Sequence, residues 1–146
     1  YRSSAASDVY KRQGRGMQKK VFRSGPYAEL IAQAVQVGNI IYLSGQVGVD
    51  EHGSAPDDLV AQTVLAYEHV KAVLAEFGAT LDNVVEETVF VTDMAQTMSQ
   101  VQEIFTARAS AYGQRPDVTQ TLVGVSALVD PAFKIEIKCT AHLEAP

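Results

Sequence analysis

The sequence predicts an α+β fold in which a mixed sheet carries two helices on one of its faces. Three patterns lead to this prediction. Polar and apolar residues alternate along 134–144, an apolar period of 3.6 residues runs through 59–77, and Gly38 and Asn39 form a turn signal between two β-rich runs. With the remaining segments, these patterns predict the element order β-β-α-β-α-β-β.

The first two strands are expected on either side of that turn signal. The segment "IAQAVQVGNIIYLSGQVGVD" holds two β-rich runs around Gly38 and Asn39, a pair typical of two-residue hairpin turns. We therefore expect strands near 31–37 and 40–47.

The segment "LVAQTVLAYEHVKAVLAEFG" predicts a long amphipathic helix. Asp57 or Asp58 can cap its first turn, and Gly78 can end it in the left-handed conformation. Its apolar face, which is expected to pack on the sheet, comprises Leu59, Ala66, Val70, Val73, Leu74 and Phe77.

The segment "VVEETVFVTDM" at 84–94 predicts the third strand. Its acidic pair, Glu86 and Glu87, is interpreted as a solvated strand edge.

A second helix is expected to follow. Thr97, with Gln100 three positions later, predicts a capping box at its start. Gly113 and Pro116 are expected to stop it. Its apolar residues are Val101, Ile104, Phe105 and Tyr112.

The stretch "RPDVTQTLVGVSALVDPAFKIEIKCTAHLE" supplies the last two strands. In the second of them one sheet face is apolar, so Cys139, which lies on that face, is expected to be buried and inert. In the first, Val123 and Val125 are taken to face the helices, which puts Gln120 on the open face with Lys138. The apolar face of the second strand comprises Ile135, Ile137, Cys139, Ala141 and Leu143. An open sheet face of mixed character favours self-association.

The length and composition of the chain fit a single domain. At 146 residues and 47% hydrophobic, it can bury one core but is short for two domains. The opening "YRSSAASDVYKRQGRG" has no apolar period and precedes Met17, so we interpret 1–16 as a non-native or disordered leader and 17–146 as the domain. No apolar run approaches the roughly 18 residues of a membrane helix, and we expect a cytoplasmic protein without a membrane partner.

Charge argues against nucleic acid as a partner. Of the twelve basic and seventeen acidic residues, four basic and one acidic lie in 1–16, which leaves eight basic and sixteen acidic and a charge of about −8. So acidic a domain repels phosphate backbones. The single cysteine cannot form a disulfide within the chain.

Four motifs in order resemble the RidA/YjgF reactive intermediate deaminase family. They are "SGPYAE" at 24–29, "VGNIIYLSGQVGVD" at 37–50, "VVEETVFVTDM" at 84–94 and "RPDVTQTLVGVSALVDPAFKIEIKCTA" at 115–141. The resemblance covers nearly all of 17–144. It implies a chorismate-mutase-like fold and a homotrimer with clefts between neighbouring subunits.

The resemblance also implies a chemistry. Such a cleft holds a small enamine or imine acid, such as 2-aminoacrylate, and hydrolyses it to a 2-keto acid and ammonia without a cofactor or metal. This reaction needs a cation to hold the carboxylate, hydrogen-bonding groups to orient the nitrogen, and a carboxylic acid to position water and move a proton.

The expected reactive pair is altered in this sequence. The family's usual arginine falls on Gln120 and its usual glutamate on Lys138, which makes these two the candidate catalytic positions. An asparagine common in the second helix aligns with Gln102 if one residue is inserted near Thr97. The candidate substrate-binding residues are Tyr27, Ser44, Gly45, Gln46, Gln102, Gln120 and Lys138.

Three roles are open for Lys138. It can anchor a small carboxylate ligand, act as a base or Schiff-base nucleophile, or pair with Glu136 or with an acidic residue across the trimer interface. Two alternatives to deamination follow: a trimer that binds small carboxylates or protects proteins without deaminating, and an enzyme that acts on a different substrate.

Overall fold

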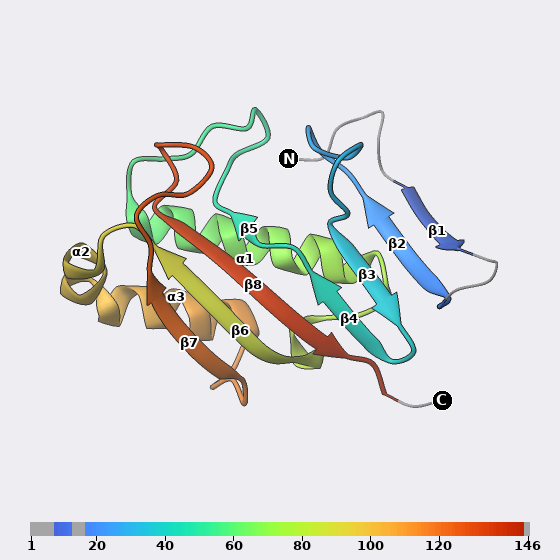
Figure 1. Cartoon of the computed structure of the whole chain (residues 1–146). Coiled ribbons are helices and arrows are strands. Elements are labelled where there is room, and N and C mark those ends of the chain that lie inside the picture. Colours follow the sequence, from blue (N-terminus) through green and yellow to red (C-terminus); the bar gives the residue numbers. More distant parts are fainter. Residues whose placement is uncertain (1–7, 13–16, 145–146) are drawn as a thin grey trace.

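The structure, a computed structural model, describes residues 8–12 and 17–144, and these ranges form a single mixed sheet with helices on one face (Figure 1). The strand order is β1-β2-β3-β4-β8-β6-β7, and β5 pairs with β8 off this path. Only the β6–β7 pair is parallel among the pairs of this sheet. The strands are β1 (Asp8–Arg12), β2 (Lys19–Arg23), β3 (Ala34–Val37), β4 (Ile40–Leu43), β5 (Gln46–Val47), β6 (Val84–Val91), β7 (Thr119–Gly124) and β8 (Ile135–His142).

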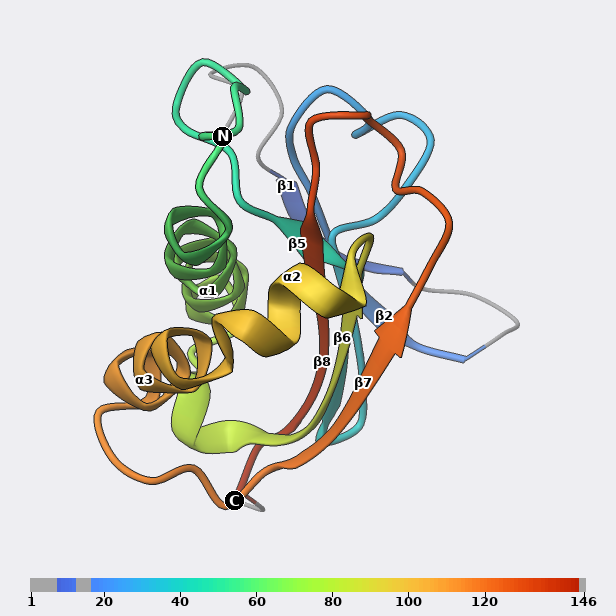
Figure 2. The same ribbon diagram turned by 90° about the vertical axis from the view of Figure 1, so that its left-hand side faces the viewer.

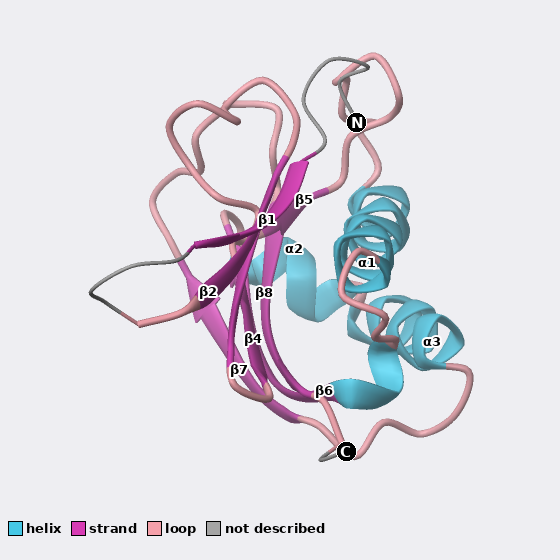
Figure 3. Cartoon of the chain, turned by 90° about the vertical axis from the view of Figure 1, so that its right-hand side faces the viewer, coloured by secondary structure: helices cyan, strands magenta, loops and turns pink. Residues whose placement is uncertain are grey.

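The three α-helices of the described residues lie on the same side of the sheet, as Figures 2 and 3 show. The opposite side of the sheet, called the open face below, carries no helix of the described ranges. The α+β prediction with helices on one face is therefore confirmed. The helices are α1 (Leu59–Ala75), α2 (Met94–Ser99) and α3 (Val101–Tyr112), with a short 3₁₀ turn η1 (Leu81–Asn83) before β6.

The helix α1 follows its sequence pattern closely. Asp58 is the N-cap, and its carboxylate accepts a hydrogen bond of 2.9 Å from the backbone N–H of Ala61. Gly78, just beyond the last turn, has a φ of +70°, the left-handed conformation in which glycine is least strained. The predicted apolar face of the helix is buried against the sheet.

The predicted second helix is divided in two, and its predicted capping box is wrong. The helix α2 begins after Asp93, whose carboxylate accepts from the N–H of Gln96 at 3.0 Å. Thr97 lies inside α2, where its hydroxyl donates to the backbone carbonyl of Asp93 at 2.7 Å. The helix α3 starts after Gln100 without a side-chain cap and ends, as predicted, at Gly113, whose φ is +76°.

The first strands differ from the prediction. The run expected near 40–47 is broken, because β4 ends at Leu43 and β5 pairs separately with the beginning of β8. The strand β2 was not predicted. The strand β1 lies within the segment interpreted as a leader and pairs antiparallel with β2, while 1–7 and 13–16 lie outside the described residues.

Candidate functional site

Lys138 lies exposed on the open face, in the middle of β8. The register pairs it with Thr88 of β6, and Thr88 pairs in turn with Thr121 of β7. Because paired residues of neighbouring strands share a sheet face, a lysine and two threonines form a row across the open face. On the other side of β8, the break between β4 and β5 brings Ser44 and Gly45 opposite Lys138, since Tyr42 pairs with Thr140 and Gln46 pairs with Ile137.

Gln120 lies on the other side of the sheet, so the prediction that it shares the open face with Lys138 is wrong. It pairs with Glu87 of β6, which pairs with the buried Cys139 of β8. Its amide Nε2 donates to the Glu87 carboxylate at 2.8 Å. The sequence was ambiguous here, because β7 and its flanking residues offer apolar side chains to both faces of the sheet. In the structure, Val118 and Leu122 pack against the core.

Ser44 is hydrogen-bonded to the segment that follows the turn containing Tyr27. Its backbone N–H donates to the carbonyl of Gln33 at 2.8 Å, and its hydroxyl donates to the carbonyl of Ala32 at 2.7 Å. The turn itself contains Tyr27, whose side chain is half exposed. The Ser44 hydroxyl is therefore a structural donor, and its oxygen keeps its capacity to accept a hydrogen bond from a ligand.

Gly45 lies close against the side chain of Glu136. A Cβ added to Gly45 would lie 2.3 Å from Oε2 of Glu136, so this position has room only for glycine while Glu136 keeps its present place. Glu136 lies two residues before Lys138 on β8. Sequence reasoning did not place it in the site, although strand alternation puts it on the same face as Lys138.

Gln46 and Gln102 lie apart from this group. Gln46 is buried on the helix side, where its Nε2 donates to Oε1 of Gln33 at 2.9 Å and to the carbonyl of Ser44 at 3.0 Å. Gln102 is exposed on α3. The structure thus brings together Ser44, Gly45 and Lys138 and places Gln46, Gln102 and Gln120 elsewhere.

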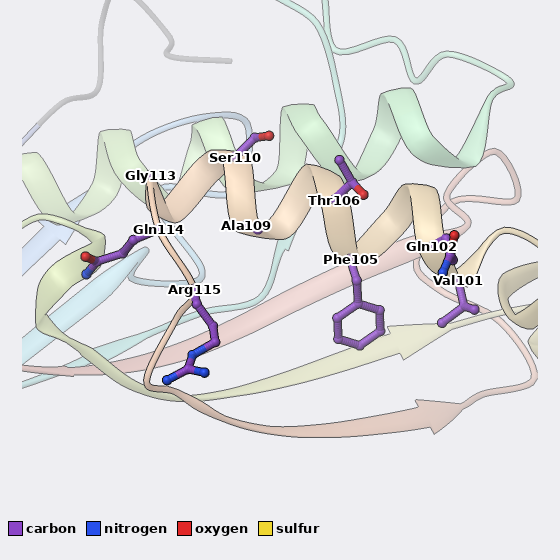
Figure 4. Close-up of a pocket in the computed structure, with 9 residues that line it drawn as sticks. All are labelled: Val101, Gln102, Phe105, Thr106, Ala109, Ser110, Gly113, Gln114 and Arg115. Carbon is purple, nitrogen blue, oxygen red and sulfur yellow. The ribbon is translucent and has the colours of Figure 1, made fainter.

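A groove of about 790 Å³ runs along α3, on the helix side of the sheet. Figure 4 shows the ring of Phe105 and the side chain of Arg115 extending from its wall, with Gln102 at the far end. Arg115 is the only ionisable side chain among its nine lining residues. The candidate site is placed on the open face instead, because three of the residues predicted for it, Ser44, Gly45 and Lys138, meet there.

A buried carboxylate cluster lies beneath the site, and sequence reasoning missed it. Glu87 is 2% exposed, which makes the prediction of a solvated edge wrong for this residue. It forms an ion pair with Arg108 at 2.5 Å, and besides Gln120 it accepts from the hydroxyls of Tyr67 at 3.1 Å and Tyr112 at 2.9 Å. Alternation along β6 puts Glu87 on the same face as the buried Val89 and Val91, and this pattern could have revealed that Glu87 is buried.

The cluster also shifts the pKa values of its members. Burial alone would lower the pKa of the Arg108 guanidinium, but the adjacent Glu87 carboxylate outweighs burial and raises it. Burial, reinforced by the negative charge of Glu87, raises the pKa of the Tyr67 and Tyr112 hydroxyls far above the usual range. Both tyrosines therefore stay protonated and act as hydrogen-bond donors.

Two other features of the described ranges bear on function. They contain no group of three or more His, Cys, Asp or Glu side chains arranged to hold a metal ion. None of their helices has the length and apolar character needed to cross a bilayer.

Comparison with known proteins places this architecture in a family. The family model described as Endoribonuclease L-PSP matches residues 21–143. The RutC family protein YjgH of Escherichia coli is 34% identical over 122 residues, which span 83% of this chain and 89% of that protein.

Two further relatives support the match. The putative reactive intermediate deaminase TdcF of Escherichia coli is 35% identical over 71 residues, 48% of this chain and 52% of that protein. The crystal structure of Rv2704 from Mycobacterium tuberculosis, a member of the YjgF/YER057c/UK114 family, superimposes with a TM-score of 0.71 at 30% identity and covers 86% of this chain and 99% of that one. The chain therefore belongs to the RidA/YjgF family, whose family model carries the description Endoribonuclease L-PSP.

Proposed function

We propose that the chain hydrolyses small reactive enamine or imine acids of the 2-aminoacrylate type to 2-keto acids and ammonia. The observation that carries the proposal is the family match over residues 21–143. It is supported by a relative whose name is putative reactive intermediate deaminase and by the row formed by Lys138, Thr88 and Thr121 on the open face. A cation flanked by hydroxyl groups is suited to holding a small carboxylate.

In this proposal Lys138 anchors the substrate carboxylate. Within the described ranges its ammonium makes no ion pair with Glu136, so it is available to a ligand. Its exposure also disfavours the nucleophile role, which depends on desolvation. A hydrogen bond to a charged group contributes about 1.5–3 kcal/mol, against about 0.5–1.5 kcal/mol for a neutral one.

We further propose that the protein is a homotrimer whose clefts lie between subunits. A single chain supplies only one wall of the site, because the open face has no covering layer among the described residues. Gln102 lies on the helix side of its own chain, and it would line a cleft only when contributed by a neighbour. The net charge of −5 argues against RNA as the substrate despite the description of the family model.

The alternative is a trimer that binds small carboxylates or protects proteins without deaminating. The observation that favours it is Lys138 itself, which stands where the family resemblance predicts a carboxylic acid. A site that has a cation in place of the acid at position 138 would bind a carboxylate without hydrolysing its imine.

The experiment that separates these functions measures ammonia and pyruvate released from enzymatically generated 2-aminoacrylate. The deaminase proposal predicts that the full chain accelerates release above the spontaneous rate, and that Lys138→Ala raises KM about tenfold or more because a charged hydrogen bond is lost. Lys71→Ala is the matched control, since Lys71 lies on α1 and pairs with the exposed Glu68.

The other outcomes are equally informative. If the full chain releases nothing above background while pyruvate raises its Tm, and Lys138→Ala abolishes the rise, the non-deaminating alternative is correct. If there is neither turnover nor stabilisation, the open face is not a carboxylate site.

A further inference from the structure

The side chain of Gln120 is held in one orientation by the buried carboxylate of Glu87. Gln120 lies on β7, on the helix side of the sheet, and its Nε2 donates to Oε1 of Glu87 at 2.8 Å. An ionised carboxylate accepts hydrogen bonds and cannot donate them, so the NH₂ group of the amide has to face Glu87. The amide carbonyl, Oε1 of Gln120, is therefore turned away from the cluster.

The rest of the cluster keeps this orientation fixed. The other donors to Glu87 come from α1 and α3, and they are Arg108 at 2.5 Å, Tyr112 at 2.9 Å and Tyr67 at 3.1 Å. Both tyrosines stay protonated, because burial raises the pKa of their hydroxyls. A turned amide would bring the carbonyl of Gln120 against the buried carboxylate with no hydrogen between the two oxygens, which is costly.

The carbonyl of Gln120 is an acceptor without a donor. Within the part of the chain that the structure describes, no hydrogen bond reaches this oxygen, and the side chain is only partly buried. Its surroundings are largely apolar, since Gln120 shares the wall of a small cavity with Phe105 and Leu122. A partly buried acceptor in apolar surroundings gains from a hydrogen bond that a ligand supplies.

This carbonyl lies on the side of the chain that the proposed trimer turns toward a neighbour. Gln120 and Lys138 of one chain lie on opposite sides of the sheet, so one chain cannot bring both to a small molecule. Phe105 lines both the cavity of Gln120 and the groove along α3 that contains Gln102. A subunit that contributes Gln102 to its neighbour's cleft would therefore bring Gln120 to the same side, opposite the neighbour's Lys138.

We propose that Gln120 determines specificity for the substrate nitrogen, an inference that rests on the proposed function and its cleft between subunits. Its carbonyl, oriented by Glu87, accepts a hydrogen bond from the N–H of a substrate whose carboxylate is bound by Lys138. 2-Aminoacrylate and its imine tautomer both carry such an N–H, whereas the 2-keto acid has an oxygen that only accepts. The cleft therefore binds the substrate in preference to the product, which is released once the nitrogen is lost.

Oxamate and pyruvate are the probes for this preference. The two anions have nearly the same size and shape, and oxamate has an NH₂ group where pyruvate has a methyl group. Oxamate is also a stable amide with the carboxylate and the nitrogen of 2-aminoacrylate in the same arrangement. Calorimetric titration of the full chain is expected to show oxamate binding about two- to tenfold more tightly than pyruvate, the effect of one neutral hydrogen bond.

Two variants assign the preference to its source. Gln120→Met keeps the length of the side chain without the amide, so it is expected to bind the two anions equally. Lys138→Ala is expected to weaken both anions by the same factor of about ten, because they share the carboxylate. The matched control is Gln36→Met on β3, where the amide donates to the carbonyl of Gly38, and it is expected to keep the wild-type preference.

The ratio of the two affinities distinguishes recognition from a structural effect. Gln120→Met also removes one donor from Glu87 and so disturbs the cluster. A loss of structure would weaken oxamate and pyruvate alike and leave their ratio unchanged, whereas loss of the acceptor changes the ratio. An unchanged preference in Gln120→Met would therefore overturn the proposal, even if both anions bind less tightly.

The contribution of two subunits has its own test. Tyr42→Lys places a charge on the open face, where subunits are expected to meet, and is expected to give a smaller assembly. In a monomer Gln120 lies across the sheet from Lys138, so the preference for oxamate is expected to disappear. A monomer that keeps the preference would overturn the assignment of the two groups to different subunits.

The outcomes separate this inference from the deaminase proposal. Equal affinities in the wild type, together with ammonia release from 2-aminoacrylate, would overturn the role of Gln120 and leave the deaminase function standing. A preference for oxamate that is lost in Gln120→Met supports the role of Gln120, and the absence of ammonia release would then overturn the deaminase function alone. Binding of neither anion, with no turnover, would overturn both.

Discussion

At the residue scale, the most consequential side chain outside the site is Glu87. It is a buried carboxylate that accepts from four side chains, which come from α1, α3 and β7. Each donor bond contributes little by itself, but together they satisfy a charge that would otherwise be very costly to bury. Because Gln120 is one of the donors, the cluster also fixes the edge strand β7 beside β6.

Glu87→Gln is expected to destabilise the fold by about 3–5 kcal/mol. The amide cannot neutralise Arg108, and its own NH₂ group would face donors that need an acceptor. Urea denaturation measures this loss. Glu86→Gln, at the exposed neighbouring position, is expected to change stability by no more than about 0.5 kcal/mol. Equal effects of the two changes would show that the Glu87 cluster adds nothing to stability.

At the element scale, the contact between α1 and the segment that follows β5 fixes the position of the site. Gly48, directly after β5, lies against the backbone of α1, and a Cβ there would be 2.1 Å from the carbonyl oxygen of Gln62. Gln62 in turn donates from Nε2 to the carbonyl of Ala132, in the loop before β8, at 2.9 Å. Nε2 of His69 lies 2.7 Å from the carbonyl oxygen of Val49. The helix therefore sets the position of both segments that carry the site.

Gly48→Ala is expected to destabilise the protein by about 1–3 kcal/mol or more, because the new methyl group collides with helix backbone that cannot rotate away. Thermal unfolding followed by circular dichroism measures the change. The control is Gly124→Ala at the end of β7, where the new Cβ would make an ordinary contact of 3.6 Å with Cε of Met94. A neutral Gly48→Ala would mean that α1 shifts freely relative to β5.

At the scale of the whole molecule, we expect chains to associate through the open face. Its exposed aromatic residue, Tyr42, is 48% accessible. Light scattering is expected to give a mass of about 47 kDa, three times the 15.7 kDa chain. Tyr42→Lys is expected to lower this mass, because a charge would have to be buried in the interface. Val64→Lys, on the exposed side of α1, is the control, and a wild type of 15.7 kDa at all concentrations would contradict the trimer.

The sequence by itself determined the class of fold and the family, because those depend on local periodicity and on the spacing of motifs. Three features could be predicted from the sequence: the apolar face of α1, the alternation along β8 and the helix end at Gly113. Each depends on a repeat of 3.6 or 2 residues or on a single glycine. Cys139 was placed correctly for the same reason.

Only the tertiary structure decided which side chains share the site. Whether Gln120 or Thr121 lies on the same face as Lys138 depends on the parallel register of β6 and β7, which are far apart in the sequence. The sequence of β7 could not decide this, because either face of the strand offered apolar residues to the core. Glu136 joined the site because the β4–β5 break brings Gly45 against it. Register and long-range approach are properties of the packed sheet, so no local pattern in the chain encodes them.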